Sequence, residues 1–244
     1  MSHRKTLLLT GASRGIGHAT VKYFHAAGWR IFTVSRQSWR EECPWAEGIV
    51  NHIHIDLEDI GQLENILPSI RQRLDGRLDA LVNNAGISPK NAHGDRIGIL
   101  FTDYATWINV FNVNLFSTAI MVRGLFEELK AVQGSIINVT SIAGSKVHPF
   151  AGAAYATSKA ALSALTREMA HEFGKYGIRV NAVAPGEIDT AILSPGTTKI
   201  VEQAIPLCRL GKPEEVAALI HFLCTSEASY INGAEIPVNG GQHV

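Results

Sequence analysis

Short apolar runs alternate with longer segments of helical pattern along this chain. The apolar runs are typical of strands buried on both faces of a sheet, and they cover residues 6–10, 30–34, 49–55, 78–83, 135–140, 178–184 and, more weakly, 234–238. Segments of helical pattern lie near residues 15–27, 58–74, 103–131, 152–175 and 213–225. This alternation predicts an α/β fold in which helices cover both faces of a parallel sheet.

The sequence contains no linker, low-complexity segment or internal repeat. We therefore predict a single domain over residues 1–244, a Rossmann-type doubly wound parallel sheet of about seven strands. The longest irregular stretch covers residues 186–212 and contains Pro195 and Pro206. Because irregular segments of this length in compact domains are commonly lids or binding loops, we expect a substrate lid there.

Composition narrows the class of protein. Of the 244 residues, 46% are hydrophobic and 18% are charged, which is typical of a globular domain. The 22 basic and 22 acidic residues balance, so we expect no nucleic-acid partner, which would need a basic face. The three cysteines form no CxxC pair and the ten histidines include no HExxH, so we expect neither a disulfide framework nor a metal site.

The first residues, MSHRKTLLLTG, contain an apolar run too short for a signal peptide. No later stretch is expected to span a bilayer. We therefore expect a cytoplasmic protein that does not contact a membrane.

A glycine-rich turn, TGASRGIG at residues 10–17, joins the first predicted strand to the first predicted helix. Gly11 allows a sharp turn, Gly15 lets the backbone approach a bulky ligand, and Gly17 lets the helix pack close to the strand. The free N–H groups of the helix would then face a pyrophosphate. The spacing is GxxxGxG rather than the general GxGxxG, and a tight turn that binds nothing is the alternative.

The segment YATSK places Tyr155 and Lys159 one helical turn apart on the same face. A phenol has a pKa of about 10, and lowering it by about 3 units requires about 4 kcal/mol. An ammonium about 4 Å away, at an effective dielectric near 20, supplies an interaction of that order. Lys159 could thus make Tyr155 a workable acid and base near neutral pH. The alternative is that Tyr155 anchors a core and Lys159 reaches past it to water.

Several motifs in order make the chain similar to a known family. TGASRGIG, NNAG at residues 83–86, Ser141 fourteen residues before Tyr155, YATSK, and PG at residues 185–186 resemble the short-chain dehydrogenase/reductase family in order and spacing. The resemblance extends from Thr10 to the closing segments GKPEEVAALIHFL and INGAEIPVNGG. It implies an enzyme that interconverts a carbonyl and a secondary alcohol by hydride transfer with a nicotinamide coenzyme.

The resemblance also implies roles for individual residues. Tyr155 is expected to be the acid/base, Ser141 to bind the substrate oxygen, Lys159 to bind the nicotinamide ribose, and Asn114 to hold a water beside Lys159. Ser141 and Asn114, each taken alone, could equally be structural. Thr140 is a rival hydroxyl, but strand alternation directs it away from the side of Ser141. Coenzyme contacts are implied at Gly11, Ser13, Arg14, Gly15, Ile16, Gly17, Ser35, Arg36, Asp56, Leu57, Asn83, Ala85, Gly86, Tyr155, Lys159, Pro185, Gly186, Ile188 and Thr190.

The end of the second predicted strand bears on the choice of coenzyme. An acidic residue there binds the ribose 2′-hydroxyl of NAD, whereas Arg accommodates the 2′-phosphate of NADP. This chain has Ser35 and Arg36 there, and Arg14 adds a second guanidinium. We therefore predict a preference for NADP(H), with NAD(H) as the alternative if both arginines are only solvated. Asp56 could instead cap the next helix rather than meet the adenine.

The substrate is less well defined by the sequence. The interval from Ser141 to Tyr155 is one residue longer than in many relatives, and His148 within it is expected to be an ordinary loop histidine. Val147, Pro149, Phe150 and the small or apolar residues 191–196 favour a neutral or partly apolar carbonyl or alcohol substrate. The motifs do not separate 3-oxoacyl reductases from polyol or sugar dehydrogenases.

Two further expectations concern assembly and activity. Relatives commonly assemble through the helices that here carry Asn114 and Tyr155, so the resemblance implies a homotetramer or homodimer. Asn239 stands where relatives often have Asp, which concerns packing or assembly. The alternative to an enzyme is a catalytically idle relative that senses or regulates through coenzyme binding, and the intact set of Asn114, Ser141, Tyr155 and Lys159 disfavours it.

Overall fold

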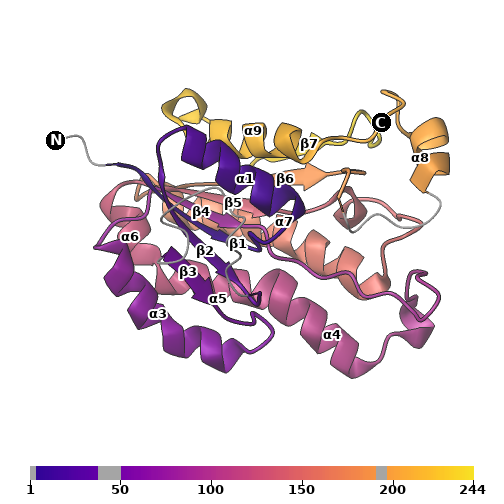
Figure 1. Ribbon diagram of the computed structural model, residues 1–244, viewed down its shortest axis with the longest axis horizontal. Coiled ribbons are helices and arrows are strands. Elements are labelled where there is room, and N and C mark those ends of the chain that lie inside the picture. Colours follow the sequence, from indigo (N-terminus) through magenta and orange to yellow (C-terminus); the bar gives the residue numbers. More distant parts are fainter. Residues whose placement is uncertain (1–3, 38–50, 191–196) are drawn as a thin grey trace.

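The computed structural model describes residues 4–37, 51–190 and 197–244. Within these ranges seven strands form one parallel sheet in the order β3-β2-β1-β4-β5-β6-β7, visible edge to edge in Figure 1. The strands are β1 Thr6–Thr10, β2 Arg30–Ser35, β3 His52–His54, β4 Ala80–Asn83, β5 Ser135–Val139, β6 Arg179–Pro185 and β7 Glu235–Val238. The predicted α/β class and strand number are therefore confirmed.

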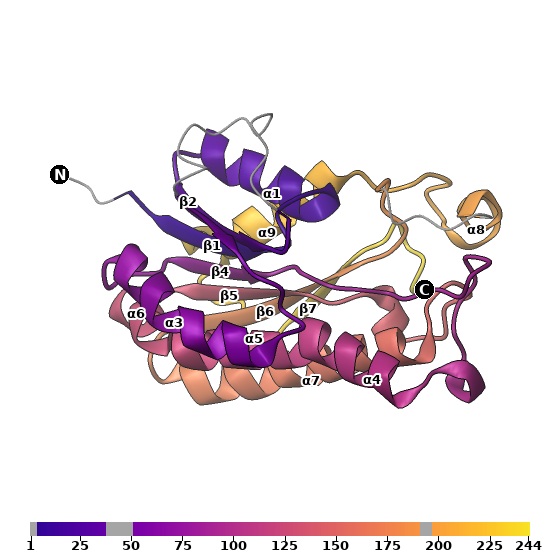
Figure 2. The same cartoon turned by 60° about the horizontal axis from the view of Figure 1, so that its bottom comes forward.

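Helices cover both faces of the sheet (Figure 2). The α-helices are α1 Gly15–Ala26, α3 Ile60–Leu74, α4 Tyr104–Phe111, α5 Ser117–Gly124, α6 Phe126–Ala131, α7 Ala153–Gly174, α8 Thr197–Ala204 and α9 Pro213–Leu223. Three short 3-10 turns are η1 Ile99–Phe101, η3 Ile142–Gly144 and η4 Ser226–Ala228, and η2 Asn112–Phe116 is a turn of π-helix. Helices α1 and α9 lie on one face, and α3 to α7 lie on the other.

Side-chain alternation in the strands explains the two layers. In β1, Leu7 and Leu9 pack with α1 and α9, whereas Leu8 points to the opposite side and packs with α3. All three leucines are fully buried. A strand that contacts helices on both faces needs apolar residues at every position, which is why these strands appear as continuous apolar runs.

Two predicted segments differ from the structure. The helix predicted near residues 103–131 is divided into α4, the π-turn, α5 and α6. The stretch predicted to be irregular over 186–212 contains the helix α8, because its prolines flank the sequence TTKIVEQA rather than interrupt it. Residues 191–196 of the predicted lid lie outside the described residues.

The continuous helical segment Tyr104–Gly124 is long and apolar enough to cross a membrane by length and composition alone. This differs from the sequence expectation. In the fold, however, the segment packs against α3 and α7, and 39% of its most apolar window is buried. Core helices pass the same test of length and hydropathy, so the segment is weak evidence for a membrane span.

Candidate active site

A cleft of about 590 Å³ opens at the carboxyl ends of the strands. In the sheet, β2 and β3 lie on one side of β1, whereas β4 and the later strands lie on the other side. The direction in which successive strands are added therefore reverses between β1 and β4. At such a reversal the loops diverge and leave a crevice, which is where open α/β sheets bind ligands. All the predicted site residues line this cleft except Asn83 and Asn114.

One end of the cleft, the glycine-turn end, is formed by Gly11–Gly17 and the tips of β2 and β3. Gly11 has φ of 73°, a left-handed conformation that glycine adopts without strain. A Cβ atom at position 17 would overlap the carbonyl oxygen of Gly11. Helix α1 therefore has to start against the turn with no side chain between them.

The amino terminus of α1 is suited to an anion. Arg14 occupies the N-cap position in an extended conformation and makes no side-chain cap, and the first turn contains no acidic residue. The first N–H groups of the helix are therefore not satisfied by a capping side chain, and the helix dipole adds partial positive charge. Together with the cradle made by Gly11 and Gly17, this end fits the pyrophosphate of a dinucleotide.

The asparagine pair at the end of β4, Asn83 and Asn84, corrects one sequence assignment. Asn84, rather than Asn83, lines the cleft, and its Nδ2 donates to the carbonyl oxygens of Thr10 at 3.0 Å and Gly11 at 2.9 Å. Asn83 is buried in the sheet and donates to Asn138 Oδ1 at 2.9 Å. Asn84 therefore holds the glycine turn in place, whereas Asn83 ties β4 to β5.

The tips of β2 and β3 carry the residues predicted to meet the adenosine. Ser35, Arg36, Asp56 and Leu57 all line the cleft. The capping alternative for Asp56 is wrong, because Asp59 is the N-cap of α3 and accepts from Gln62 N at 2.9 Å. Within the described part of the chain, the guanidinium of Arg36 makes no hydrogen bond or ion pair, and the same holds for Arg14 in the glycine turn.

The opposite end of the cleft, the Tyr155 end, contains Ser141, Tyr155 and Lys159. Ser141 follows β5, and its side chain caps η3 by accepting from Ala143 N at 3.2 Å. Tyr155 lies on α7, and the Ser141 side chain is close enough to affect the pKa of its phenol. The rival hydroxyl, Thr140, donates to Val183 O at 3.1 Å and is buried between strands. Ser141 is thus the hydroxyl that faces Tyr155.

The electrostatics of Tyr155 differ from the sequence expectation. Burial raises the pKa of the Tyr155 phenol, the hydrogen bond from Ser141 opposes this, and the negative charge of Glu187 adds to the increase. Lys159 is buried, its Nζ donates to Val139 O at 2.7 Å, and burial lowers its pKa to about 8. Its Nζ lies 5.9 Å from the centroid of the Tyr155 ring. In this structure the phenol is therefore held in its neutral form.

Asn114 lies behind the wall of the cleft. It sits in the π-turn η2, where its Oδ1 accepts from Ile87 N at 2.8 Å and its Nδ2 donates to Ser158 Oγ at 2.9 Å. A Cβ atom added to Gly86 would lie 3.3 Å from Lys159 Nζ and 3.5 Å from Asn114 Oδ1. Asn114 and Lys159 therefore flank the same small stretch of backbone, and the π-turn brings Asn114 there.

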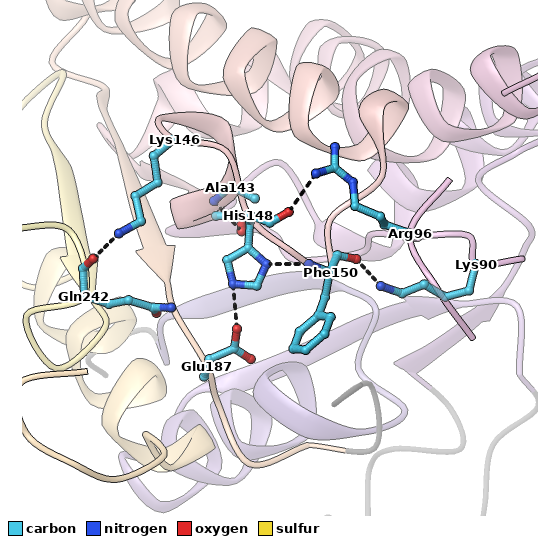
Figure 3. A network of polar contacts seen from close by, with 9 residues as sticks. Lys90, Arg96, Ala143, Lys146, His148, Phe150, Glu187 and Gln242 are labelled. Carbon is cyan, nitrogen blue, oxygen red and sulfur yellow. Dashed lines mark hydrogen bonds and ion pairs between the residues drawn. The ribbon is translucent and has the colours of Figure 1, made fainter. Parts of the chain in front are cut away.

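Three polar residues that the sequence did not mark as site residues line the Tyr155 end: Lys90, His148 and Glu187. Figure 3 shows His148 between the backbone of Phe150 and the carboxylate of Glu187. His148 lies in a loop as expected, but it is buried and lines the cleft. Val147 is 84% exposed and does not line the cleft, so it does not provide the apolar wall that the sequence suggested.

Comparisons with known proteins agree with this fold and cleft. The profile of a family described as enoyl-(acyl carrier protein) reductase matches residues 11–243. The chain belongs to the short-chain dehydrogenase/reductase family and to its class of oxidoreductases.

Three known proteins show how similar members of the family are to this chain. Protein FixR of Bradyrhizobium diazoefficiens is 57% identical over 242 residues, which is 98% of this chain and 87% of that protein. The 3-oxoacyl-(acyl-carrier-protein) reductase FabG of Thermotoga maritima is 37% identical over 97% of each chain. An oxidoreductase of this family from Brucella ovis, solved with a partially ordered NAD, is 55% identical with a TM-score of 0.84, covering 97% of this chain and 100% of that one.

Proposed function

We propose that this protein is an NADP(H)-dependent oxidoreductase that interconverts a carbonyl compound and a secondary alcohol, with Tyr155 as acid and base. The observation that carries the proposal is that Ser141, Tyr155 and buried Lys159 together line one end of a cleft whose other end fits a dinucleotide. A proton donor and an oxyanion-binding hydroxyl at one point are what carbonyl reduction requires.

The roles of the residues follow from their chemistry. Ser141 donates to the substrate oxygen and orients it, and Tyr155 gives that oxygen a proton as negative charge develops on it. Because the pKa of Tyr155 is raised, the phenol is protonated at neutral pH, which suits the reducing direction. The nicotinamide coenzyme supplies the hydride when it is bound. Lys159 holds positive charge beside Tyr155 and stabilises the phenolate left behind.

The preference for NADP(H) rests on Arg14 and Arg36. Arg36 follows a strand that ends in Ser35 rather than an acidic residue, and Arg14 lies in the glycine turn. Neither guanidinium has a partner among the described residues, so the two can bind a 2′-phosphate with charge-assisted hydrogen bonds. The Brucella ovis relative holds NAD, so the comparison of the two coenzymes is the direct test. A higher kcat/KM with NADH than with NADPH would contradict the preference.

We also propose a homotetramer or homodimer that assembles through α4, α5 and α7, in the cytoplasm. Tyr104 on α4 is 79% exposed and Phe116 at the end of the π-turn is 43% exposed, so apolar surface is present on this layer. Small residues on α7, such as Ala156 and Ala160, allow close helix packing. Sedimentation of wild type and of Phe116→Glu tests the assembly, since a buried charge would dissociate it.

The experiment that tests the activity is NADPH consumption against a panel of ketones, β-ketoesters and diketones, with Tyr155→Phe as control. Turnover that depends on Tyr155 is the expected result. Coenzyme binding with no turnover of any carbonyl would contradict the proposal and favour a regulatory relative that only binds the coenzyme.

A further inference from the structure

Two loops form facing parts of the Tyr155 end. The β5–α7 loop, residues 145–152, lies between Ser141 and Tyr155, and the β6 loop, residues 186–190, follows β6. The loops leave neighbouring strands, because β5 and β6 pair side by side in the sheet. The way in which the loops are held together therefore determines the shape of this end of the cleft.

The strands alone do not hold these two loops together. The pairing of β5 with β6 ends where Thr140 N donates to Val183 O at 2.9 Å. Beyond that point, no backbone hydrogen bond joins the β5–α7 loop to the β6 loop, and both loops lie wholly within the described ranges. Segments without such bonds open easily, so side-chain contacts have to fix the separation of the loops.

One contact between the loops lies inside the cleft (Figure 3). His148 Nε2 lies 2.7 Å from Glu187 Oε1, and the two side chains are only 9% and 11% exposed. His148 Nδ1 accepts from Phe150 N at 3.3 Å, so the neutral ring carries its proton on Nε2, toward the carboxylate. The geometry is that of an electrostatic contact rather than a linear hydrogen bond. A carboxylate buried to this extent is costly without a partner, and His148 provides one.

A second contact lies outside the cleft, at the C-terminal turn of residues 239–242. Lys146 Nζ of the β5–α7 loop donates to Gln242 O (Figure 3). Gly186, the first residue of the β6 loop, donates from its N to Val238 O at 3.0 Å and lies against the buried side chain of Gln242. The C-terminal turn therefore contacts both loops at once.

The separation of the loops matters for the proposed reaction because each loop serves a different reactant. The β5–α7 loop connects Ser141 and Tyr155, which act on the substrate oxygen. The β6 loop contains Ile188 and Thr190, which are expected to face the nicotinamide. Hydride transfer needs reacting atoms about 3–3.5 Å apart, and a displacement of about 1 Å can lower the rate about 100-fold.

We infer that His148 and Glu187 are positioning residues, which hold the β5–α7 loop against the β6 loop and thereby set the distance between the substrate carbonyl and the coenzyme. Lys146 and the C-terminal turn fix the same distance from outside the cleft. Loss of either contact lets the loops separate and slows the chemical step, while the groups expected to bind the coenzyme remain. This inference rests on the proposed oxidoreductase function.

A double-mutant cycle tests the pair. The assay is NADPH-dependent reduction of ethyl acetoacetate, or of the carbonyl in the panel above that wild type reduces fastest. In His148→Phe and in Glu187→Leu, kcat should fall by about 10- to 100-fold, with the Kd for NADPH changed by less than about twofold. The double variant should lose no more than the weaker of the two single variants, because both substitutions break the same contact. Losses that multiply would overturn the inference.

Hydrogen exchange in the coenzyme-free protein gives a readout independent of activity. Glu187→Leu should speed the exchange of the amides of residues 145–152 by at least about twofold, as expected for the loss of one polar contact. The substitution lies in the other loop, so unchanged exchange would contradict the positioning role. Asp189→Leu is the matched control: Asp189 is exposed in the same loop, does not line the cleft, and should change neither exchange nor kcat.

Lys146→Met decides the matter if a variant inside the cleft fails to fold. Lys146 is exposed and does not line the cleft, so the substitution removes no core or ligand contact. It should lower kcat by at least about twofold, the effect of one hydrogen bond, with KM unchanged and faster exchange in residues 145–152. No change in kcat or exchange would overturn the inference. Failure of the proposed function differs from both results, since wild type would then reduce no carbonyl in the panel.

Discussion

The glycine-turn end and the Tyr155 end of the cleft differ in what they present to a ligand. At the glycine-turn end the surface is mainly backbone: glycines and the uncapped start of α1, held by Asn84. At the Tyr155 end it is mainly side chains, contributed by α7 and by three loops. The glycine-turn end suits a ligand that is the same in every reaction. The side chains of the Tyr155 end can differ between proteins that bind different substrates.

This difference predicts where substitutions act. At the glycine-turn end a Cβ atom added to Gly11 or Gly17 would meet a neighbouring backbone atom at 2.8 Å or 2.1 Å. At the Tyr155 end a substitution removes one functional side chain and leaves the rest of the cleft in place. The following experiments test the contrast, starting with the largest expected effect.

Tyr155→Phe should lower kcat by about 10²- to 10⁴-fold, which is the usual contribution of a general acid or base. Coenzyme affinity should change little, because only one oxygen atom is removed. Steady-state kinetics and coenzyme titration measure the two quantities. Residual activity above a few percent of wild type would count against Tyr155 as the proton donor.

Arg36→Ser should lower kcat/KM for NADPH by about 10- to 100-fold, since a hydrogen bond to a charged group contributes about 1.5–3 kcal/mol. The kcat/KM for NADH should change by less than about twofold, because NADH has no 2′-phosphate for Arg36 to bind. Kinetics with both coenzymes provide the measurement. An equal loss with both coenzymes would assign Arg36 to the fold instead.

Gly17→Val should destabilise the fold by about 1–3 kcal/mol, the usual cost of overpacking, and should weaken coenzyme binding. The cause is the overlap of the new Cβ atom with Gly11 O. Thermal unfolding and coenzyme titration report both effects. Gly98→Ala is the matched control, since Gly98 has φ of −77° and no atom within 4 Å of its would-be Cβ atom. A normal coenzyme affinity in Gly17→Val would refute the close approach.

Alcohol oxidation should become faster as pH rises above neutrality, by about tenfold per unit below the pKa of the base. Oxidation requires the Tyr155 phenolate, and burial raises the pKa of this phenol, so the phenolate is scarce at pH 7. Carbonyl reduction uses the neutral phenol and should be nearly independent of pH until Lys159, whose pKa burial lowers to about 8, loses the charge that stabilises the phenolate. Rate profiles in both directions test this, and a flat oxidation profile would exclude the phenolate.

Val147→Ser should change kcat/KM by less than about twofold. Val147 is 84% exposed and does not line the cleft, although it directly precedes His148. Exposed substitutions of this kind usually have small effects. A change of substrate preference in Val147→Ser would contradict the position of Val147 outside the cleft.

The sequence predicts the glycine-turn end well, because its chemistry depends on local patterns. Apolar periodicity identifies the first two strands and the first helix. The glycines follow the first strand and an arginine follows the second, so their places in the fold can be read from the sequence. The choice of Asn83 over Asn84 fails for a local reason. Successive strand residues point to opposite sides, and one residue of uncertainty in the strand end reverses the assignment.

The Tyr155 end is predicted only in part. Tyr155, Lys159 and Ser141 carry recognisable spacings, but His148 and Glu187 meet across two loops that are distant in the sequence. Nothing in either segment indicates the other. The π-turn that brings Asn114 against Ile87 is also invisible, since an inserted helical residue leaves the local composition unchanged.

The position of Gly186 has a practical consequence for experiments on this protein. A Cβ atom there would lie 2.6 Å from Asn239 Cβ and 2.7 Å from Gln242 Oε1, and Lys146 Nζ donates to Gln242 O. The last described residues thus brace the rim of the binding cleft, whereas β1 begins at the opposite edge of the sheet (Figure 1). An affinity tag or fluorophore fused after Val244 would emerge beside the ligands, so the amino-terminal side is the safer point of attachment.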